Sequence, residues 1–413
     1  MTKSTIYGGK ELNGEISINA SKNAALPILC ASLLNKGKTK ILNLPKIDDI
    51  NQLLSIFSYL NINYSYKDTF QINPTNFEYK TLAISDVTKF RASYYLIGVF
   101  LYLFDKCEIN TPGGCNLGNR PLNYHLEAFK KMGYKIEYDK ETIKISREYM
   151  TRKITYKLEK PSVGATINII LAGLKSGVTI INYAKEPEVI DTINFLNKMG
   201  CNIYYKDNLY VMPSTINKNI AYSIIPDRIE ALTYVIMALL CGNIKINNIN
   251  LLHIDSIIKL LIINGANIQI EKNALVVYKS KITPFNFETD YYPGIPTDIQ
   301  PLLSVLFLYN KGNVFIKDDI FENRFSALYE LQKLGAKCEI NPPYAKITNS
   351  VLIGGNVVAK DLRAAAALLV CALASKCVTT IENYEIINRG YAHIYDNLKN
   401  LGAKFENETV LLE

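Results

Sequence analysis

A helix pattern that ends in a glycine and passes directly into an alternating strand pattern occurs six times along this sequence of 413 residues. Glycine is favoured at such helix ends because it adopts the left-handed backbone conformation without a steric penalty. The residues at the six ends are Asn61, Gly133, Gly200, Gly265, Gly335 and Gly402, spaced by 65 to 72 residues. This spacing predicts six similar units of about 68 residues that together fill the chain.

Each predicted unit also contains a second, more apolar helix ahead of the amphipathic one. These helices carry little charge on any side, which indicates that other elements enclose them. They cover residues 24–34, 92–104, 165–174, 231–240, 299–309 and 364–374. We therefore predict an α/β protein with helices inside and sheets outside, in which three units share one helical core and six units form two domains with a cleft between them. A continuous solenoid is the alternative arrangement.

The composition is that of an ordinary folded protein. Hydrophobic residues make up 48% and charged residues 20% of the chain, so extensive disorder is not expected. The longest apolar stretch, Tyr94 to Phe104, is shorter than the roughly 20 residues that cross a bilayer. The N-terminus has no secretory or lipidation pattern, so we expect a cytoplasmic protein that does not bind membranes.

The positions of the cysteine, histidine and basic residues argue against a metal site and against a nucleic-acid partner. The eight cysteines form no CxxC pair, and we expect seven of them to be buried, reduced thiols. The three histidines have no ligand spacing, so no metal site is expected. The formal charge of +8 is not concentrated in basic runs, which indicates a dispersed surface charge and no nucleic-acid partner.

Cationic side chains lie at the starts of several apolar helices. Serine, asparagine, aspartate and threonine at these positions are expected N-caps. A cation there opposes the helix dipole, so its presence points to an anionic ligand held by the free amides and the side chain. The cations in question are Lys22, Arg91, Arg228 and Arg363.

The second loop of several units adds more arginines, among them Arg120, Arg324 and Arg389. These side chains can converge with the helix-start cations only if the helix starts of both domains face one cleft. Arginine suits forked pairing with carboxylate or phosphate. We therefore expect a ligand with several negative charges.

Cys115 differs from the other seven cysteines because it lies in a loop with three glycines and two prolines, where no apolar stripe could bury it. We expect it to be exposed and mobile, with Arg120 favouring its thiolate, as a candidate nucleophile or proton donor. A surface cysteine without function is the alternative. A cysteine protease is a poor match, because nothing besides proximity in sequence supports His125 as its base.

Nine motifs in this order resemble those of the UDP-N-acetylglucosamine 1-carboxyvinyltransferases, members of the enolpyruvyl transferase family, over essentially the whole chain. They are Ser21–Pro27, Pro112–Cys115, Gly118–Pro121, Ser162–Thr166, Pro226–Glu230, Pro296–Asp298, Phe321–Phe325, Asp361–Arg363 and Arg389–Tyr391. The resemblance implies a two-domain inside-out α/β barrel with its active site in the interdomain cleft. One domain would be 22–225, with the Cys115 lid loop, and the other 1–21 with 226–413.

The resemblance also implies the reaction and its partners. The enolpyruvyl group of phosphoenolpyruvate would pass to the 3′-hydroxyl of UDP-N-acetylglucosamine with release of phosphate, the committed step of peptidoglycan synthesis. No cofactor is implied, although Cys115 could form a covalent enolpyruvyl or pyruvate adduct. The glycines around Cys115 would permit a lid that closes after the sugar nucleotide binds. We expect a monomer.

Site residues follow from the motif positions. Those expected at phosphoenolpyruvate are Lys22, Asn23, Arg120, Arg324, Arg363 and Arg389, with Lys22, Arg120 and Arg389 at its phosphate. Those expected at the sugar nucleotide are Asn23, Arg91, Arg120, Pro121, Leu122, Asn123, Tyr124, Lys160, Pro161, Ser162, Val163, Asp298 and Ile320. Cys115 would be the general acid and Asp298 the base for the sugar hydroxyl, although Asp298 could also simply be the N-cap of the helix that follows.

Among the departures from the family pattern, which include Tyr94–Tyr95 and Gly98–Val99 in a helix, three concern the site. Asn123 and Asn388 stand where aspartate is usual and Lys185 where arginine is usual, which puts lid latching and nucleotide affinity in doubt. The related transferase that acts on shikimate 3-phosphate is the nearest alternative, but it lacks a cysteine lid of this type. A non-catalytic anion-binding repeat scaffold is the other.

Overall fold

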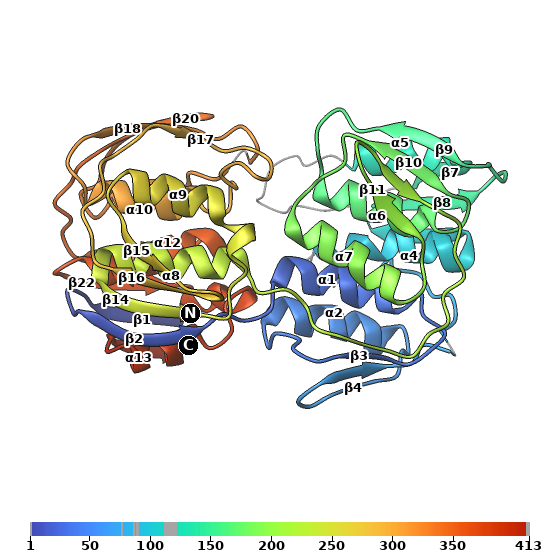
Figure 1. The fold of residues 1–413 in the computed structure, drawn as a ribbon, viewed down its shortest axis with the longest axis horizontal. Coiled ribbons are helices and arrows are strands. Elements are labelled where there is room, and N and C mark those ends of the chain that lie inside the picture. Colours follow the sequence, from blue (N-terminus) through green and yellow to red (C-terminus); the bar gives the residue numbers. More distant parts are fainter. Residues whose placement is uncertain are drawn as a thin grey trace. The chain divides into compact units, whose positions relative to one another are not determined.

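The computed structural model describes residues 2–75, 77–85, 87, 91–110, 122–139, 141–321 and 323–409, with only the backbone of Arg91 and Thr409. The chain divides into two compact units (Figure 1). We call Met1–Asn19 with Pro226–Glu413 unit 1, and Ala20–Ile225 unit 2. The chain therefore leaves unit 1 early, forms unit 2 and returns.

Unit 1 contains three four-stranded mixed sheets in the described part of the chain. The first has the order β21 (Gly355–Val358), β22 (Val378–Glu382), β1 (Thr2–Tyr7) and β23 (Lys404–Thr409). The second is β15 (Asn267–Ile270), β16 (Ala274–Tyr278), β14 (Gly242–Asn247) and β2 (Leu12–Ser17). The third is β17 (Phe287–Glu288), β18 (Asn313–Lys317), β20 (Tyr344–Thr348) and β19 (Lys337–Asn341).

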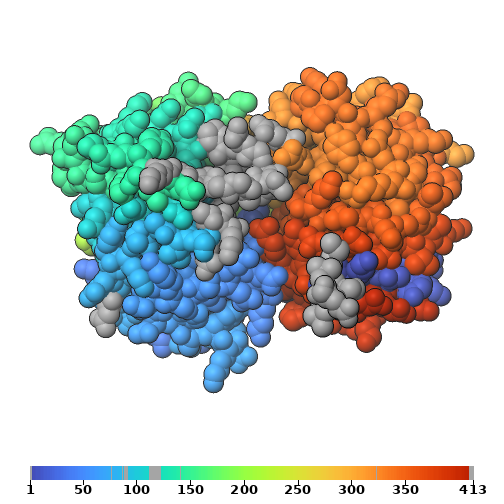
Figure 2. Space-filling model, turned by 180° about the vertical axis from the view of Figure 1, so that it is seen from behind, coloured from blue at the N-terminus to red at the C-terminus, as the bar shows by residue number. Residues whose placement is uncertain are grey.

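The N-terminal segment is an integral part of unit 1. Strand β1 pairs antiparallel with both β22 and β23, and β2 pairs parallel with β14, from Leu12 opposite Gly242 to Ser17 opposite Asn247. Figure 2 shows the dark-blue N-terminal segment among the red C-terminal segments. Because these strands supply partners for the backbone of the C-terminal half, unit 1 needs both parts of the chain.

Unit 2 is built from two four-stranded mixed sheets and a three-stranded antiparallel one in its described residues. The first is β13 (Ile220–Tyr222), β3 (Thr39–Ile41), β5 (Phe70–Ile72) and β4 (Tyr64–Tyr66). The second is β11 (Ile203–Tyr205), β12 (Leu209–Val211), β10 (Val178–Ile181) and β9 (Ile154–Lys157). The third is β6 (Lys106–Asn110), β8 (Thr142–Arg147) and β7 (Tyr134–Asp139).

Apolar helices form the core of each unit, as their lack of charge predicts. In unit 1 these are α8 (Arg228–Cys241), α10 (Gln300–Leu308) and α12 (Leu362–Ala374), which contact one another. In unit 2 they are α1 (Lys22–Ser32), α4 (Tyr95–Phe104), preceded by the 3-10 turn η1 (Arg91–Tyr94), and α6 (Val163–Gly173). Close packing of α4 on α6 depends on Gly98, whose N–H donates to Asn168 Oδ1 at 2.9 Å. A Cβ at Gly98 would lie 2.7 Å from the Asn168 carbonyl oxygen.

The amphipathic helices end as the sequence predicts. They are α2 (Asp48–Tyr59), α5 (Asn123–Lys131), α7 (Pro187–Lys198), α9 (Asp255–Ile263), α11 (Ser326–Gln332) and α13 (Ile394–Asn400). The six predicted turn residues that follow them all have positive φ, from 57° at Asn61 to 105° at Gly200. Asparagine tolerates this conformation better than most residues, which explains why it can replace glycine at Asn61.

The cysteines are less uniformly buried than expected. All seven that the structure describes are free thiols, and Cys30, Cys107, Cys201, Cys241 and Cys371 are buried. Cys338 and Cys377 are only partly buried, so the prediction of seven buried thiols is wrong for these two. Cys338 belongs to β19, the edge strand of its sheet, and an edge strand has no neighbour on one side to cover it.

Two further observations concern the described residues. They contain no helix long and apolar enough to span a membrane. They also contain no cluster of histidine, cysteine, aspartate and glutamate side chains suited to hold a metal ion.

A buried glutamate holds the chain where it leaves unit 1. Glu230 on α8 is 2% exposed, and its two carboxylate oxygens accept hydrogen bonds from the backbone N–H and the Nδ2 of Asn19, both at 2.9 Å. Burial, and then the nearby Asp227, raise the pKa of Glu230 from 4.5 to about 8. The stabilising contribution of the protonated form is therefore complete below pH 4.5 and is lost as the pH rises through about 8.

We expect Glu230→Gln to reduce the pH dependence of stability. Between about pH 5 and pH 8 the titration of one such group lowers the free energy of unfolding by up to about 1.4 kcal/mol per pH unit. Glutamine has no such titration, so calorimetric melts of the variant should shift less with pH than those of the wild-type chain. Glu339→Gln, on an 80% exposed side chain, is the control and should follow the wild type. Equal pH slopes for all three proteins would contradict this role of Glu230.

Candidate active site

One carboxylate in unit 1 binds two buried guanidinium groups. Asp298 Oδ1 lies 2.9 Å from an amino nitrogen of Arg324, and Asp298 Oδ2 lies 2.8 Å from one of Arg363. The arginine side chains are 6% and 9% exposed, and that of Asp298 is 23% exposed. Isolated buried charges are strongly destabilising, so this shared pairing is what allows both cations to be buried.

Three separate segments bring these groups together. Asp298 precedes α10, Arg324 lies two residues before α11, and Arg363 lies in the first turn of α12. Asp361 caps α12 by accepting hydrogen bonds from the N–H groups of Arg363 and Ala364. This N-cap fixes the start of α12, and with it the position from which the Arg363 side chain reaches Asp298.

Each arginine has further partners that orient it. Arg324 Nε donates to Thr297 Oγ1 at 3.0 Å, and its guanidinium carbon lies 4.1 Å from the centre of the Phe321 ring. Arg363 donates to the Tyr391 hydroxyl at 3.4 Å, and that hydroxyl lies 2.9 Å from Thr233 Oγ1. Burial by itself would lower the pKa of Arg363, but the Asp298 carboxylate raises it above its ordinary value. Arg363 is therefore a permanent cation.

The structure corrects the alternative role of Asp298 as an N-cap. The N-cap position of α10 falls one residue later, on Ile299, which has no capping side chain. Ser21, Ser162, Asp227 and Asp361 do cap their helices, as predicted for helix-start residues of this kind. The Asp298 carboxylate is instead directed to the two arginines.

The start of α1 in unit 2 carries a comparable ion pair. Lys22 Nζ lies 2.6 Å from Asp49 Oδ2, and the two side chains are 12% and 2% exposed. Lys22 is the first residue of α1, after the N-cap Ser21, and Asp49 lies in the first turn of α2. The carboxylate offsets the unfavourable position of a lysine at a helix N-terminus. Asn23 follows Lys22 and is half-buried.

Apart from Asn23 on α1 and the backbone of Arg91, the described sugar-nucleotide residues of unit 2 are at the starts of the neighbouring helices α5 and α6. Leu122 is buried, Asn123 is exposed, and the Tyr124 hydroxyl donates to Glu159 at 3.5 Å. Lys160 is exposed, and the next three residues, Pro161, Ser162 and Val163, are half-buried. His125 is buried. The two short segments that the motifs select are therefore close together in the fold.

Several expected residues cannot be placed. Cys115, Arg120 and Pro121 lie outside the described residues, as does the side chain of Arg91. In unit 1, Ile320 is half-buried in the loop after β18, and Arg389 is half-buried at the end of the 3-10 helix η3 (Tyr384–Arg389).

The departures at Asn123, Lys185 and Asn388 are all in the described part of the chain. Asn123 is the first residue of α5, and Asn388 lies within η3. The Lys185 ammonium lies 5.9 Å from the centre of the Tyr183 ring. None of the three disturbs the contacts between Asp298 and its two arginines.

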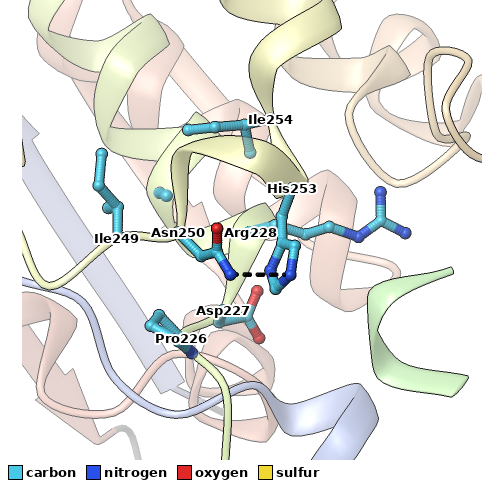
Figure 3. A pocket seen from close by; sticks show the side chains of 8 residues that line it. Pro226, Asp227, Arg228, Ile249, Asn250, His253 and Ile254 are labelled. Atoms are coloured by element: carbon cyan, nitrogen blue, oxygen red, sulfur yellow. Dashed lines mark hydrogen bonds between the residues drawn. The ribbon is translucent and has the colours of Figure 1, made fainter. Parts of the chain in front are cut away.

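A small pocket lies elsewhere in unit 1, at the start of α8 (Figure 3). Asp227, Arg228, Asn250 and His253 are among its lining residues, and Asn250 Nδ2 lies 3.0 Å from His253 Nε2. The Arg228 guanidinium carbon lies 5.5 Å from the centre of the Tyr292 ring, which is a cation–π contact. Its lining includes none of the residues assigned to either substrate, so we do not identify this pocket with the active site.

We expect Asp298→Asn to destabilise unit 1, because it leaves two buried guanidinium groups without their shared counter-ion. Breaking a buried ion pair on one side costs about 3 kcal/mol or more. Calorimetric unfolding of the ligand-free protein measures the loss. Asp319→Asn is the control, since the Asp319 side chain is 52% exposed and its contact with Lys317 is a surface pair. A variant at Asp298 as stable as the control would contradict this account.

Comparisons with known proteins identify the family. A family model described as EPSP synthase (3-phosphoshikimate 1-carboxyvinyltransferase) matches residues 6–398. A protein of Staphylococcus aureus named UDP-N-acetylglucosamine 1-carboxyvinyltransferase 2 is 39% identical over 98% of both chains. The protein of the same name from Staphylococcus epidermidis is 38% identical over 98% of both chains.

Solved structures share the fold. The enolpyruvyl transferase NikO from Streptomyces tendae superimposes with a TM-score of 0.90 at 21% identity, covering 99% of both chains. EPSP synthase from Acinetobacter baumannii has a TM-score of 0.76 at 15% identity, covering 99% of this chain and all of that one. At these identities the likeness is one of fold, and the sequence relatives carry the narrower relationship. The chain therefore belongs to the enolpyruvyl transferase family, and within it is similar to the UDP-N-acetylglucosamine 1-carboxyvinyltransferases.

Proposed function

We propose that this protein transfers the enolpyruvyl group of phosphoenolpyruvate to the 3′-hydroxyl of UDP-N-acetylglucosamine and releases phosphate, as a step of peptidoglycan synthesis. The identity of 39% over nearly the whole chain with enzymes named for this substrate supports the choice. The observation on which the proposal rests is the position of Asp298 between Arg324 and Arg363.

The cluster fits what the reaction requires. A carbon–oxygen bond forms between the sugar O3 and carbon 2 of phosphoenolpyruvate, while the hydroxyl loses its proton and carbon 3 gains one. Loss of phosphate and of one proton from carbon 3 then restores the double bond. A carboxylate can accept the hydroxyl proton, and guanidinium groups can bind the substrate's carboxylate through paired hydrogen bonds.

We assign roles accordingly. Asp298 is the base for the sugar hydroxyl, Arg324 and Arg363 bind the substrate carboxylate, and Lys22, Arg120 and Arg389 bind its phosphate. Cys115 delivers the proton to carbon 3 and can carry a covalent adduct. Asn23, Arg91, residues 120–124 and 160–163, and Ile320 contact the sugar nucleotide. The assignment of Lys22 is supported by its position at a helix start, where a phosphate can bind, and by Asp49, which holds the ammonium group in place.

The finer features of the enzyme remain part of this proposal. They comprise the inside-out barrels built from six repeats, the interdomain location of the substrates, the closing Cys115 loop, a reaction without cofactor, a monomeric state and a cytoplasmic location.

Transfer to shikimate 3-phosphate is the second candidate, favoured by the description of the matching family model. Phosphate release with phosphoenolpyruvate and each acceptor separates the two. UDP-N-acetylglucosamine alone should support turnover. Turnover only with shikimate 3-phosphate would replace the proposal, and turnover with neither would favour a non-catalytic anion-binding scaffold.

The role of Asp298 predicts a loss of turnover in Asp298→Asn. Asparagine cannot accept the proton, and loss of a general base lowers kcat by about 10²- to 10⁴-fold. Phosphate release should be measured well below the melting temperature of the variant, so that unfolding does not contribute. Asp319→Asn should retain the wild-type kcat. A kcat within about threefold of wild type in Asp298→Asn would exclude it as the base.

A further inference from the structure

Asp318 is a buried carboxylate that accepts several hydrogen bonds near the arginine cluster. It follows β18 and is 2% exposed. Its Oδ2 accepts a hydrogen bond from Thr297 Oγ1 at 2.7 Å. Its Oδ1 accepts hydrogen bonds from the backbone N–H groups of Ile320 and Phe321, both at 3.2 Å. Because a buried carboxylate needs such partners, its position and the positions of these groups fix one another.

The hydrogen bonds of the Thr297 hydroxyl can have only one donor and acceptor arrangement when Asp318 is ionised. Arginine can only donate hydrogen bonds, and an ionised carboxylate can only accept them. The Thr297 hydroxyl has a single hydrogen, so it must donate to Asp318 and accept from Arg324 Nε, 3.0 Å away. Asp318 therefore controls which way the hydroxyl points, and the hydroxyl in turn fixes the Nε edge of the Arg324 guanidinium.

The same carboxylate holds the turn that follows β18. The turn brings the Phe321 ring to 4.1 Å from the guanidinium carbon of Arg324. It also sets the backbone position of Ile320. Arg324 is thus held by Thr297, by the Phe321 ring and by Asp298, and two of these three supports depend on Asp318.

We propose that Asp318 is a positioning residue that serves both substrates, through Thr297 for the arginine that binds phosphoenolpyruvate and through the Ile320 backbone for the sugar nucleotide. This inference rests on the proposed function. Asp318 is 2% exposed, so the proposed role is to position other groups and not to contact a substrate. Thr297 acts through Arg324, whereas Asp318 acts both through Thr297 and through the Ile320 backbone. We therefore expect the two residues to differ in their effect on the Michaelis constant for UDP-N-acetylglucosamine.

Burial raises the pKa of Asp318 above its ordinary value, and the hydrogen bond from Thr297 and the charge of Arg324 oppose that shift. The contacts that position Arg324 are therefore also contacts that favour the ionised carboxylate. The ionised state is the one in which the direction of the hydrogen bonds is fixed.

The test compares KM for each substrate in three variants. Thr297→Val removes the hydroxyl, and we expect KM for phosphoenolpyruvate to rise about tenfold while KM for UDP-N-acetylglucosamine stays within about twofold. Thr297→Ser restores the hydroxyl and should recover most of the loss. Asp318→Asn should raise both constants, because an amide that donates to Thr297 leaves the hydroxyl hydrogen without its acceptor and alters the turn. Asp319→Asn is the neighbouring exposed control and should match the wild type.

Some outcomes would overturn the proposal. If Thr297→Ser behaves like Thr297→Val, the hydroxyl is not the positioning group. If Asp318→Asn lowers only the melting temperature and leaves both constants unchanged, Asp318 is merely structural. The comparison of Thr297→Val with Thr297→Ser tests the positioning of Arg324 even if Asp318→Asn does not fold.

Failure of the proposed function would be visible separately, in the wild-type chain. If that chain uses shikimate 3-phosphate instead, KM for phosphoenolpyruvate still reports on Arg324. If it turns over neither acceptor, thermal stabilisation by phosphoenolpyruvate alone is the readout. Thr297→Val should then need about tenfold more of this ligand for the same rise in melting temperature, and an equal requirement would overturn the inference.

Discussion

The pairing of one carboxylate with two buried guanidinium groups is the interaction on which the described part of the site depends. Neither Arg324 nor Arg363 could be buried without an anion, and Asp298 supplies that anion in the protein itself. A carboxylate substrate offers the arginines the same chemical partner. In the proposed reaction the substrate carboxylate would therefore bind the same guanidinium donors that Asp298 binds in the ligand-free protein.

The fold makes this pairing possible by bringing helix starts together. In unit 1 the apolar helices α8, α10 and α12 contact one another inside the sheets. Helix α10 carries no charged residue and α12 carries none after Arg363, so the charged groups of the cluster are confined to the helix starts and the residues just before them. Asp298 and Arg324 each lie two residues before a helix, α10 and α11, and Arg363 lies in the first turn of α12. The apolar core thus determines where the charges gather.

Local patterns in the sequence predict the turns, the apolar helices and most helix starts, because these features depend on residues a few positions apart. Asn61 and the five glycines lie in left-handed turns, and four predicted N-caps are present. The partners of the charged residues could not be predicted in this way. Asp49, Thr297, Asp318 and Tyr391 act across the fold and have no local signature. The role of Asp298 could not be decided from the sequence, because it depends on the exact residue at which α10 begins. With the N-cap at Ile299, one residue later than Asp298, the carboxylate forms ion pairs and does not cap the helix.

Lys22 and Arg363 show why a cation at a helix start is informative even without its partner. Each lies next to a helix N-terminus, where a positive charge is unfavourable, and each has a carboxylate within 3 Å. The ligand-free protein therefore satisfies the cation with its own acid. The Asp49 side chain, 2% exposed, is more enclosed than that of Asp298, 23% exposed, although both are aspartates paired with a basic group. The more accessible carboxylate is the one suited to exchange a proton with a substrate hydroxyl, and the enclosed one is suited to hold a lysine in place.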